Sequence, residues 1–194
     1  MRPIGEGAYG EVWLARSKAT GRYRAVKIVY RARFTNEEPY ETEFSGVRRF
    51  EEVSREHEGF VDILHVSRDD EAQYFAYVME LADDRDGGPP IDPAAYMPRT
   101  LARELEARGR LDPAECVKVG VALASALADL HRRSLVHRDV KPSNIVFVRG
   151  APKLADVGLV TEIKSQAGTL IGSPAYMDTA VHGTAQGDLF GLGF

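Results

Sequence analysis

Cysteine is almost absent from this sequence, because Cys116 is the only one in 194 residues. A single cysteine cannot form a disulfide within the chain, so no disulfide framework stabilises the fold. Cys116 falls on the apolar periodicity of a predicted helix, which indicates a buried and inert thiol. This cysteine usage predicts a cytoplasmic location.

Long apolar runs and an excess of basic charge are missing as well. No uninterrupted apolar stretch approaches the roughly 18 residues of a membrane span, and the first residues lack a signal-peptide pattern. The formal net charge is -4 with a pI near 5.8, whereas proteins that bind duplex nucleic acid carry a dense basic face. We therefore expect no membrane segment in this stretch and no nucleic-acid partner.

The composition that remains is that of a globular protein. Hydrophobic residues make up 44% and charged residues 28% of the chain, and neither repeats nor low-complexity tracts interrupt them. The length suits one ordinary domain, or a small lobe joined to part of a larger one.

Strand character dominates the first third of the chain. Four runs rich in β-branched, aromatic and apolar side chains predict strands at residues 11–15, 23–30, 61–66 and 74–81. The charged stretch 37–58 places Phe44, Val47 and Phe50 at three-residue spacing, which predicts one helix.

The chain changes character after residue 81. Residues 82–98 are polar and rich in helix breakers, which predicts a loop between lobes. Thr100 predicts the start of a helix that runs to Gly109, and Asp112 predicts the start of a longer one that ends near Ser134. The longer helix has an apolar stripe wide enough for contacts on more than one side, at Val117, Val121, Leu123, Ala124, Leu127 and Leu130.

A glycine-rich pattern lies near the N-terminus. Residues 5–12, Gly-Glu-Gly-Ala-Tyr-Gly-Glu-Val, match G-x-G-x-x-G-x-V, whose glycines let backbone amides approach phosphate oxygens. The dinucleotide-binding form of this pattern begins a helix, whereas residues 11–15 continue as a strand. The pattern alone is as typical of a flexible glycine loop, but the strand after it favours a hairpin flap.

Lys27 lies on the next predicted strand. A lone strand lysine is as often a surface residue at a sheet edge, but one shortly after a glycine flap can supply a cation to the α- and β-phosphates of a nucleotide. Such a lysine needs a carboxylate to orient it, and Glu43 on the predicted helix is our candidate. The nearby alternatives are Glu41, Glu51 and Glu52.

Residues 137–144 carry the strongest signal. Their sequence, His-Arg-Asp-Val-Lys-Pro-Ser-Asn, matches H-R-D-x-x-x-x-N directly after the long helix, and a simple polar turn rarely reproduces four such identities. The segment offers the Asp139 carboxylate for a hydroxyl proton, the Lys141 ammonium for a phosphoryl group and the Asn144 amide oxygen for a metal. In-line phosphoryl transfer needs all three.

With these motifs in order, the chain resembles the catalytic domain of eukaryotic-type serine/threonine protein kinases. Its sequence resembles that of bacterial members. The resemblance implies that Asp139 is the catalytic base, assisted by Lys141, Lys27 and Glu43. It implies an ATP site at Ile4, Gly5, Gly7, Gly10, Val12, Ala25, Lys27, Met79, Glu80 and Leu81. Within this site Met79 would be the gatekeeper, and the backbone near Leu81 would contact adenine.

The same resemblance implies that Asn144 and Asp156 bind Mg²⁺. Asp156 stands in the place of the family's Asp-Phe-Gly motif, with Val157 where phenylalanine is usual. An Asp-x-Gly stretch alone is as often an ordinary turn, but its position after Asn144 favours the metal-binding interpretation. Because the carboxylate is kept, we expect metal binding to persist.

The resemblance also implies a regulatory segment. Arg138 corresponds to an arginine that pairs with a phosphate on the activation loop in kinases switched by phosphorylation. Thr161, Ser165 and Thr169 are candidate autophosphorylation sites, with ordinary loop hydroxyls as the alternative.

Two departures from the family pattern affect the prediction. Residues 178–180 are Asp-Thr-Ala where the family has Ala-Pro-Glu, so the glutamate that anchors the peptide-binding segment is missing. Residues 188–193 resemble the start of the central C-lobe helix, and the sequence stops at Phe194. We therefore expect a kinase domain truncated at both ends.

These features predict an α+β, two-lobed, protein-kinase-like fold, with a β-rich N-lobe in residues 1–82 and an incomplete helical C-lobe in residues 83–194. The predicted reaction transfers the γ-phosphoryl group of ATP, with Mg²⁺, to a serine or threonine of a protein substrate. The alternatives are a pseudokinase scaffold, an inactive kinase fragment and a small-molecule phosphotransferase. The sequence indicates no oligomeric state.

Overall fold

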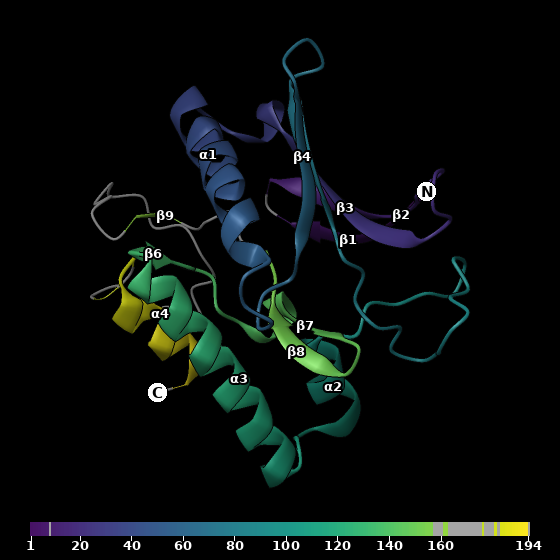
Figure 1. Cartoon of the computed structure of the whole chain (residues 1–194), viewed down its shortest axis with the longest axis vertical. Helices are drawn as coiled ribbons and strands as arrows, with labels where there is room; N and C mark the ends of the chain where they lie inside the picture. The colour runs from purple at the N-terminus through teal and green to yellow at the C-terminus, as the bar shows by residue number, and fades with distance from the viewer. Residues whose placement is uncertain (8, 157–160, 163–175, 177–180, 182, 194) are drawn as a thin grey trace.

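The computed structural model of the protein describes residues 1–7, 9–156, 161–162, 176, 181 and 183–193. The chain forms two lobes, an upper β-sheet with one helix against it and a lower group of helices (Figure 1). The predicted two-lobed α+β fold is thereby confirmed. The exact boundary at residue 82 stays a prediction.

The N-lobe is built on an antiparallel sheet of five strands in the order β1-β2-β3-β5-β4. The strands are β1 (Arg2–Gly7), β2 (Gly10–Arg16), β3 (Tyr23–Tyr30), β4 (Ile63–Asp69) and β5 (Tyr74–Met79). In β3 and β5 every second residue is buried, because alternate side chains point to opposite faces of a sheet. Lys27 of β3 lies directly opposite Tyr77 of β5, so the two side chains share one face.

Helix α1 (Glu37–Ser54) follows the short 3₁₀ helix η1 (Arg31–Arg33) and packs against the sheet beside β4 (Figure 1). Its buried side includes Tyr40, Val47 and Phe50, which meets the predicted apolar spacing in part. The helix ends at Ser54, whose hydroxyl accepts a hydrogen bond from the backbone N–H of Ile63. This contact ties the last residue of α1 to the first residue of β4.

The C-lobe contains helices α2 (Leu101–Arg108), α3 (Pro113–Arg132) and α4 (Ala185–Leu192). The Thr100 hydroxyl accepts the backbone N–H of Arg103 and caps α2. Gly109 follows the helix with a φ of 74°, which glycine adopts without strain. The Asp112 carboxylate caps α3 in the same way. The two helices predicted here are confirmed.

Two predictions about α3 are wrong. Its apolar stripe was expected to include Val117 and Val121, but each is 65% exposed. Cys116 is exposed as well, so it is not the buried thiol that its periodicity indicates. A helix with 3.6 residues per turn places Val117 and Val121 away from the buried face. Cys116 lies in line with that face but in the first turn of the helix, before its first buried residue, Val119. That buried face consists of Val119, Leu123, Ala126, Leu127, Asp129 and Leu130.

Two small sheets frame residues 137–144. Strand β6 (Leu135–Val136) pairs with β9 (Thr161–Glu162), and β7 (Ile145–Val148) pairs with β8 (Ala151–Leu154) after the 3₁₀ helix η2 (Pro142–Asn144). The core continues from one lobe to the other, since the backbones of Phe60 and Leu154 pair in a single β-bridge and both residues are fully buried. In the described ranges, no helix is both long and apolar enough to cross a membrane.

The predicted loop at residues 82–98 connects the lobes without a helix or strand of its own. A bridge between Asp84 and Pro98 closes its base, and Tyr96 is buried with its hydroxyl donating to the carbonyl oxygen of Ala82, 3.0 Å away. The Arg2 guanidinium donates to the carbonyl oxygens of Pro93 and Tyr96. The loop is therefore fastened to β1 as well as to the start of the C-lobe.

Candidate active site

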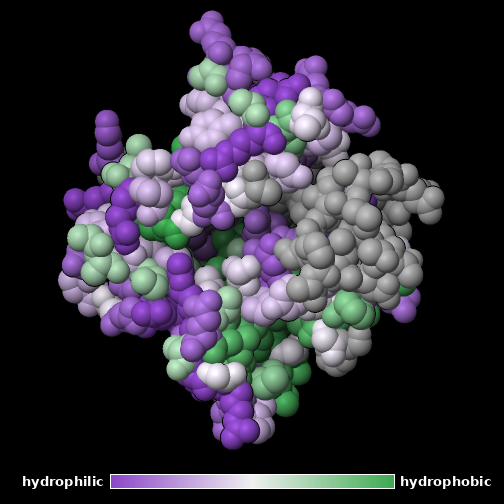
Figure 2. Space-filling model, turned by 180° about the vertical axis from the view of Figure 1, so that it is seen from behind, coloured by the Kyte–Doolittle hydropathy of each residue, from purple (hydrophilic) through white to green (hydrophobic). Residues whose placement is uncertain are grey.

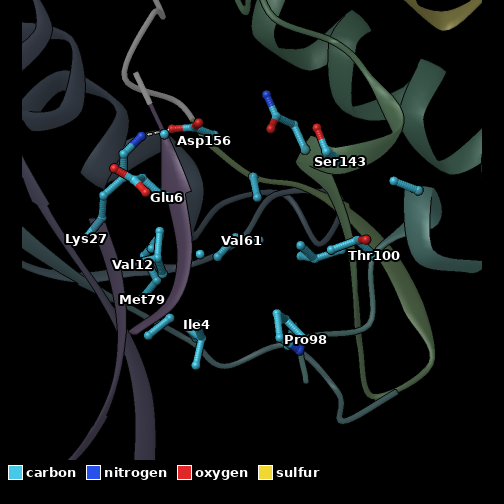
Figure 3. Close-up of a pocket in the computed structure, with 18 of the residues that line it drawn as sticks. Ile4, Glu6, Val12, Lys27, Val61, Met79, Pro98, Thr100, Ser143 and Asp156 are labelled. Carbon is cyan, nitrogen blue, oxygen red and sulfur yellow. Dashed lines mark hydrogen bonds and ion pairs between the residues drawn. The ribbon is translucent and has the colours of Figure 1, made fainter. Parts of the chain in front are cut away.

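A pocket of about 800 Å³ lies between the two lobes, a volume typical of small-molecule sites. The surface is visibly hollowed there (Figure 2), and residues from both lobes line the cavity (Figure 3). Most of the predicted site residues line it, namely Ile4, Gly5, Gly7, Val12, Ala25, Lys27, Glu43, Met79, Glu80, Asp139, Lys141, Asn144 and Asp156. Gly10 and Leu81 were predicted for this site but are not part of its lining.

The glycine pattern forms the hairpin between β1 and β2, as its following strand indicated. Gly7 pairs with Gly10 across the turn. A β-carbon at Gly10 would collide with the carbonyl oxygen of Ile28 in the neighbouring strand, so this glycine serves the close approach of β2 to β3. By contrast, a β-carbon at Gly7 would meet nothing closer than 3.9 Å.

Two contacts hold the hairpin above the pocket. The Tyr9 ring stacks on Phe34, with centroids 4.3 Å apart. The Arg33 guanidinium donates to the Gly7 carbonyl oxygen and to Glu6, at 3.2 Å in each case. The flap is thus attached to the segment that leads into α1.

Lys27 points from β3 into the pocket and forms an ion pair with Asp156 (Figure 3). Burial opposes the charged lysine, but the nearby Asp156, Tyr77 and Glu43 raise its pKa above the usual value. Burial likewise favours the neutral form of Asp156, yet the Lys27 ammonium holds the pKa of that carboxyl below its usual value. Both groups are therefore charged at neutral pH.

Glu43 is the carboxylate of α1 that faces this ion pair. It is only 4% exposed, and burial raises its pKa to about 7 although Lys27 opposes the rise. The alternatives point elsewhere, because Glu41 pairs with Arg68, Glu51 pairs with Arg55 and Glu52 is exposed. In this structure, however, the ion-pair partner of Lys27 is Asp156 and not Glu43.

The segment 137–144 brings its three polar side chains together opposite the N-lobe. The Lys141 ammonium lies 2.7 Å from a carboxylate oxygen of Asp139. The Asn144 side-chain nitrogen donates to the same oxygen at 2.8 Å and to the Asp139 carbonyl oxygen at 2.9 Å. These contacts fix the buried Asp139 and leave the amide oxygen of Asn144 for another partner.

Asp188 holds this segment in place, a role that our sequence analysis missed. Its carboxylate accepts the backbone N–H groups of His137 and Arg138, at 2.8 and 2.7 Å, and lies 2.8 Å from the His131 ring. It is 2% exposed. An acid at the start of the apolar run 189–194 was the available signal, because a buried carboxylate needs nearby donors.

Asp156 is positioned by the backbone around it. The N–H of Ala155 donates to the carbonyl oxygen of Asn144, and the ring of His137 lies 3.1 Å from the carbonyl oxygen of Ala155. Asp156 itself has a φ of 60°, a conformation that is uncommon outside glycine. Val157 and Gly158, the rest of its motif, lie outside the described residues.

The hinge differs in detail from the expectation. Met79 ends β5 beside the pocket, and the Glu80 side chain pairs with Lys153 and accepts the backbone N–H of Asp62. Ala82, rather than Leu81, lines the cavity. Leu81 instead packs against the hydrophobic core.

The predicted regulatory residues are described only in part. Arg138 has a φ of 69°, and burial lowers the pKa of its guanidinium although Asp188 opposes this. The backbone of Thr161 pairs with Val136 in β9. Ser165 and Thr169 lie outside the described residues, as do residues 178–180.

Comparison with known proteins identifies the family. The model of the protein kinase domain matches residues 1–193. The chain is 32% identical over 200 residues to "Probable serine/threonine-protein kinase PkwA" of Thermomonospora curvata, covering 98% of this chain and 24% of that protein. It is 32% identical over 200 residues to the serine/threonine-protein kinase AfsK of Streptomyces coelicolor, covering 98% and 22%. It is 28% identical over 207 residues to the serine/threonine-protein kinase PrkC of Bacillus subtilis, covering 100% and 28%.

The chain therefore spans about a quarter of the length of these relatives. The family match, in contrast, includes both lobes and every motif that lines the pocket. The chain belongs to the protein kinase domain family.

Proposed function

We propose that this chain is a serine/threonine protein kinase domain that transfers the γ-phosphoryl group of ATP to a protein hydroxyl. The observation that carries the proposal is the convergence of Lys27, Asp139, Lys141, Asn144 and Asp156 on one pocket between the lobes. The family and the names of the relatives support the same reaction.

The pocket has the chemistry that ATP requires. Apolar side chains such as Val12 and Met79 suit an adenine ring, and Gly5 and Gly7 let the backbone of the flap approach a ligand at those two positions. Lys27 supplies a buried positive charge, which is what the α- and β-phosphates need.

Mg²⁺ fits the same pocket because two oxygen donors are available there. Asp156 is a carboxylate whose pKa lies below its usual value, and the amide oxygen of Asn144 is left over when its nitrogen donates to Asp139. Magnesium prefers such hard oxygen ligands and, when bound, neutralises the charge of the β- and γ-phosphates.

Asp139 is the proposed base, since its carboxylate lines the pocket and is held there by Lys141 and Asn144. Lys141 lies beside it and places a second positive charge near the transferred group. Together these residues orient the hydroxyl, receive its proton and stabilise negative charge.

A pseudokinase is the alternative that one observation favours, namely the Asp-Thr-Ala sequence at 178–180. The complete set of acids, lysines and asparagine in the pocket favours the enzyme. A small-molecule phosphotransferase is less well supported, because residues 172–176 keep the Gly-Ser-Pro-Ala-Tyr sequence typical of a protein-substrate segment. The proposal includes a protein substrate and the cytoplasmic location that the sequence predicts.

The test compares two variants for Mg·ATP binding and for phosphate transfer. Asp139→Asn should bind Mg·ATP like the wild type but transfer phosphate about 10² to 10⁴ times more slowly. Asp156→Asn should lose metal-dependent binding and transfer together. A basic protein, an aminoglycoside and choline serve as acceptors. Full activity of Asp139→Asn would refute the assigned base, and wild-type transfer to a small acceptor alone would refute the protein kinase.

A further inference from the structure

Tyr77 is a buried polar residue of the pocket for which neither the sequence motifs nor the proposed chemistry gives a role. It lies on β5 opposite Lys27 of β3, and it lines the pocket while being fully buried. The Lys27 nitrogen lies 5.9 Å from the centre of its ring. Opposite residues of antiparallel strands have neighbouring side chains, so the register alone brings phenol and ammonium together.

The Tyr77 hydroxyl has no hydrogen bond of normal geometry with any residue that the structure describes, although the Lys27 ammonium lies close enough to lower the pKa of the phenol as a hydrogen-bond donor does. It nevertheless lies within the electrostatic reach of Lys27, Glu43 and Asp156, and burial is the main reason that its pKa is raised. Buried hydroxyl groups are almost always paired, so an unpaired one next to charged groups requires an explanation.

The Glu43 carboxylate is likewise buried without a hydrogen-bond partner among the described residues. Within the described part of the chain it also takes part in no ion pair, although it is buried beside Lys27. Lys27 has three N–H donors, of which Asp156 receives one. The Lys27 ammonium, the Tyr77 hydroxyl and the Glu43 carboxylate therefore lie near one another, while the ammonium is paired with Asp156.

We propose that Tyr77 is a positioning residue for Lys27. When Asp156 turns from Lys27 to serve as a metal ligand, the Tyr77 hydroxyl accepts a hydrogen bond from the ammonium and donates one to the Glu43 carboxylate. The hydroxyl then links the strand lysine to α1. This inference rests on the proposed function, because that function requires Asp156 to bind a metal ion in place of Lys27.

The test is Tyr77→Phe, which keeps the ring and removes the oxygen. The variant should melt at the same temperature as the unliganded wild type or higher, because the removed hydroxyl is unpaired there. It should lower kcat/KM about tenfold, the order expected for one hydrogen bond to a charged group. Tyr40→Phe is the matched control, since Tyr40 is a buried tyrosine of the same lobe outside the pocket, packed on Phe34 and Phe75.

A double-mutant cycle with Glu43→Gln separates positioning from a general effect on packing. Because Tyr77 is proposed to act through Glu43 and Lys27, Tyr77→Phe should cause little further loss in the Glu43→Gln background. The cycle is measured both on kcat/KM and on the Mg·ATP dissociation constant. Wild-type activity in Tyr77→Phe, or losses that multiply in both measurements, would overturn the inference.

The two measurements also separate this inference from the proposed function. If the wild type binds Mg·ATP but transfers no phosphate, the proposed kinase activity is wrong, and non-additivity in the dissociation constant still supports the role of Tyr77. If the wild type binds no Mg·ATP, both proposals are refuted.

Discussion

The carboxylate of Asp188 lies 2.7 Å from the backbone nitrogen of Arg138. Through this contact helix α4, near the end of the sequence, determines the conformation of a segment 50 residues earlier. Arg138 has a positive φ, and such a conformation persists only when its surroundings impose it. The conformation of residues 137–144 therefore depends on α4 as well as on their own sequence.

Asp188→Ala should strongly destabilise the protein. The substitution leaves the backbone N–H groups of His137 and Arg138 buried without an acceptor, at a cost of about 2 to 5 kcal/mol. Asp188→Asn keeps one acceptor oxygen and should cost less. Urea unfolding of both variants measures the difference. Equal stability of Asp188→Ala and the wild type would contradict the structural role.

Two glycines of the flap should differ in their tolerance of alanine. Gly10→Ala places a methyl group against the Ile28 carbonyl, so it should destabilise the N-lobe by about 1 to 3 kcal/mol. Gly7→Ala meets no close atom and should leave the melting temperature nearly unchanged. Thermal melts decide the matter. A larger loss for Gly7→Ala would show that the register of the hairpin is different.

Glu43 should make the unliganded protein less stable as the pH rises. Its pKa is about 7 in the fold against 4.5 ordinarily, so between these values the folded state holds more protons than the unfolded state. The stabilisation is complete below pH 4.5 and is lost as the pH rises through 7, by up to about 3 kcal/mol. The Glu43→Gln variant cannot titrate and is the control. The difference between the two unfolding free energies should therefore fall from pH 5 to pH 8; a constant difference would contradict the assigned shift.

An active form of the protein should carry phosphate on one or more of Thr161, Ser165 and Thr169. A phosphate there offers a dianion to Arg138, which can order the segment through charge-assisted hydrogen bonds. Mass spectrometry of protein incubated with Mg·ATP locates the modification, with Asp139→Asn as the inactive control. If the three hydroxyls stay unmodified and their replacement by alanine leaves activity unchanged, the segment is not regulated in this way.

The fold was predictable where local chemistry is strong. A signal within a few residues marks the strand 23–30, the capped helices after Thr100 and Asp112, and the polar segment 137–144. The buried face of α3 was not predictable to the same degree. Val117 and Val121 are as apolar as Leu123, and only the position of the neighbouring elements leaves them exposed.

The types and order of the groups in the pocket follow from the amino-acid sequence, because motif spacing is a property of the chain. The partners of these groups follow from the packing of the folded chain. Lys27 pairs with Asp156, 129 residues away. Tyr77 lies beside Lys27 through strand register, and Asp188 of α4 holds the backbone of His137 and Arg138. Such contacts depend on how separate elements pack in space, and charged groups in a low-dielectric interior pair with whichever partner that packing brings within reach.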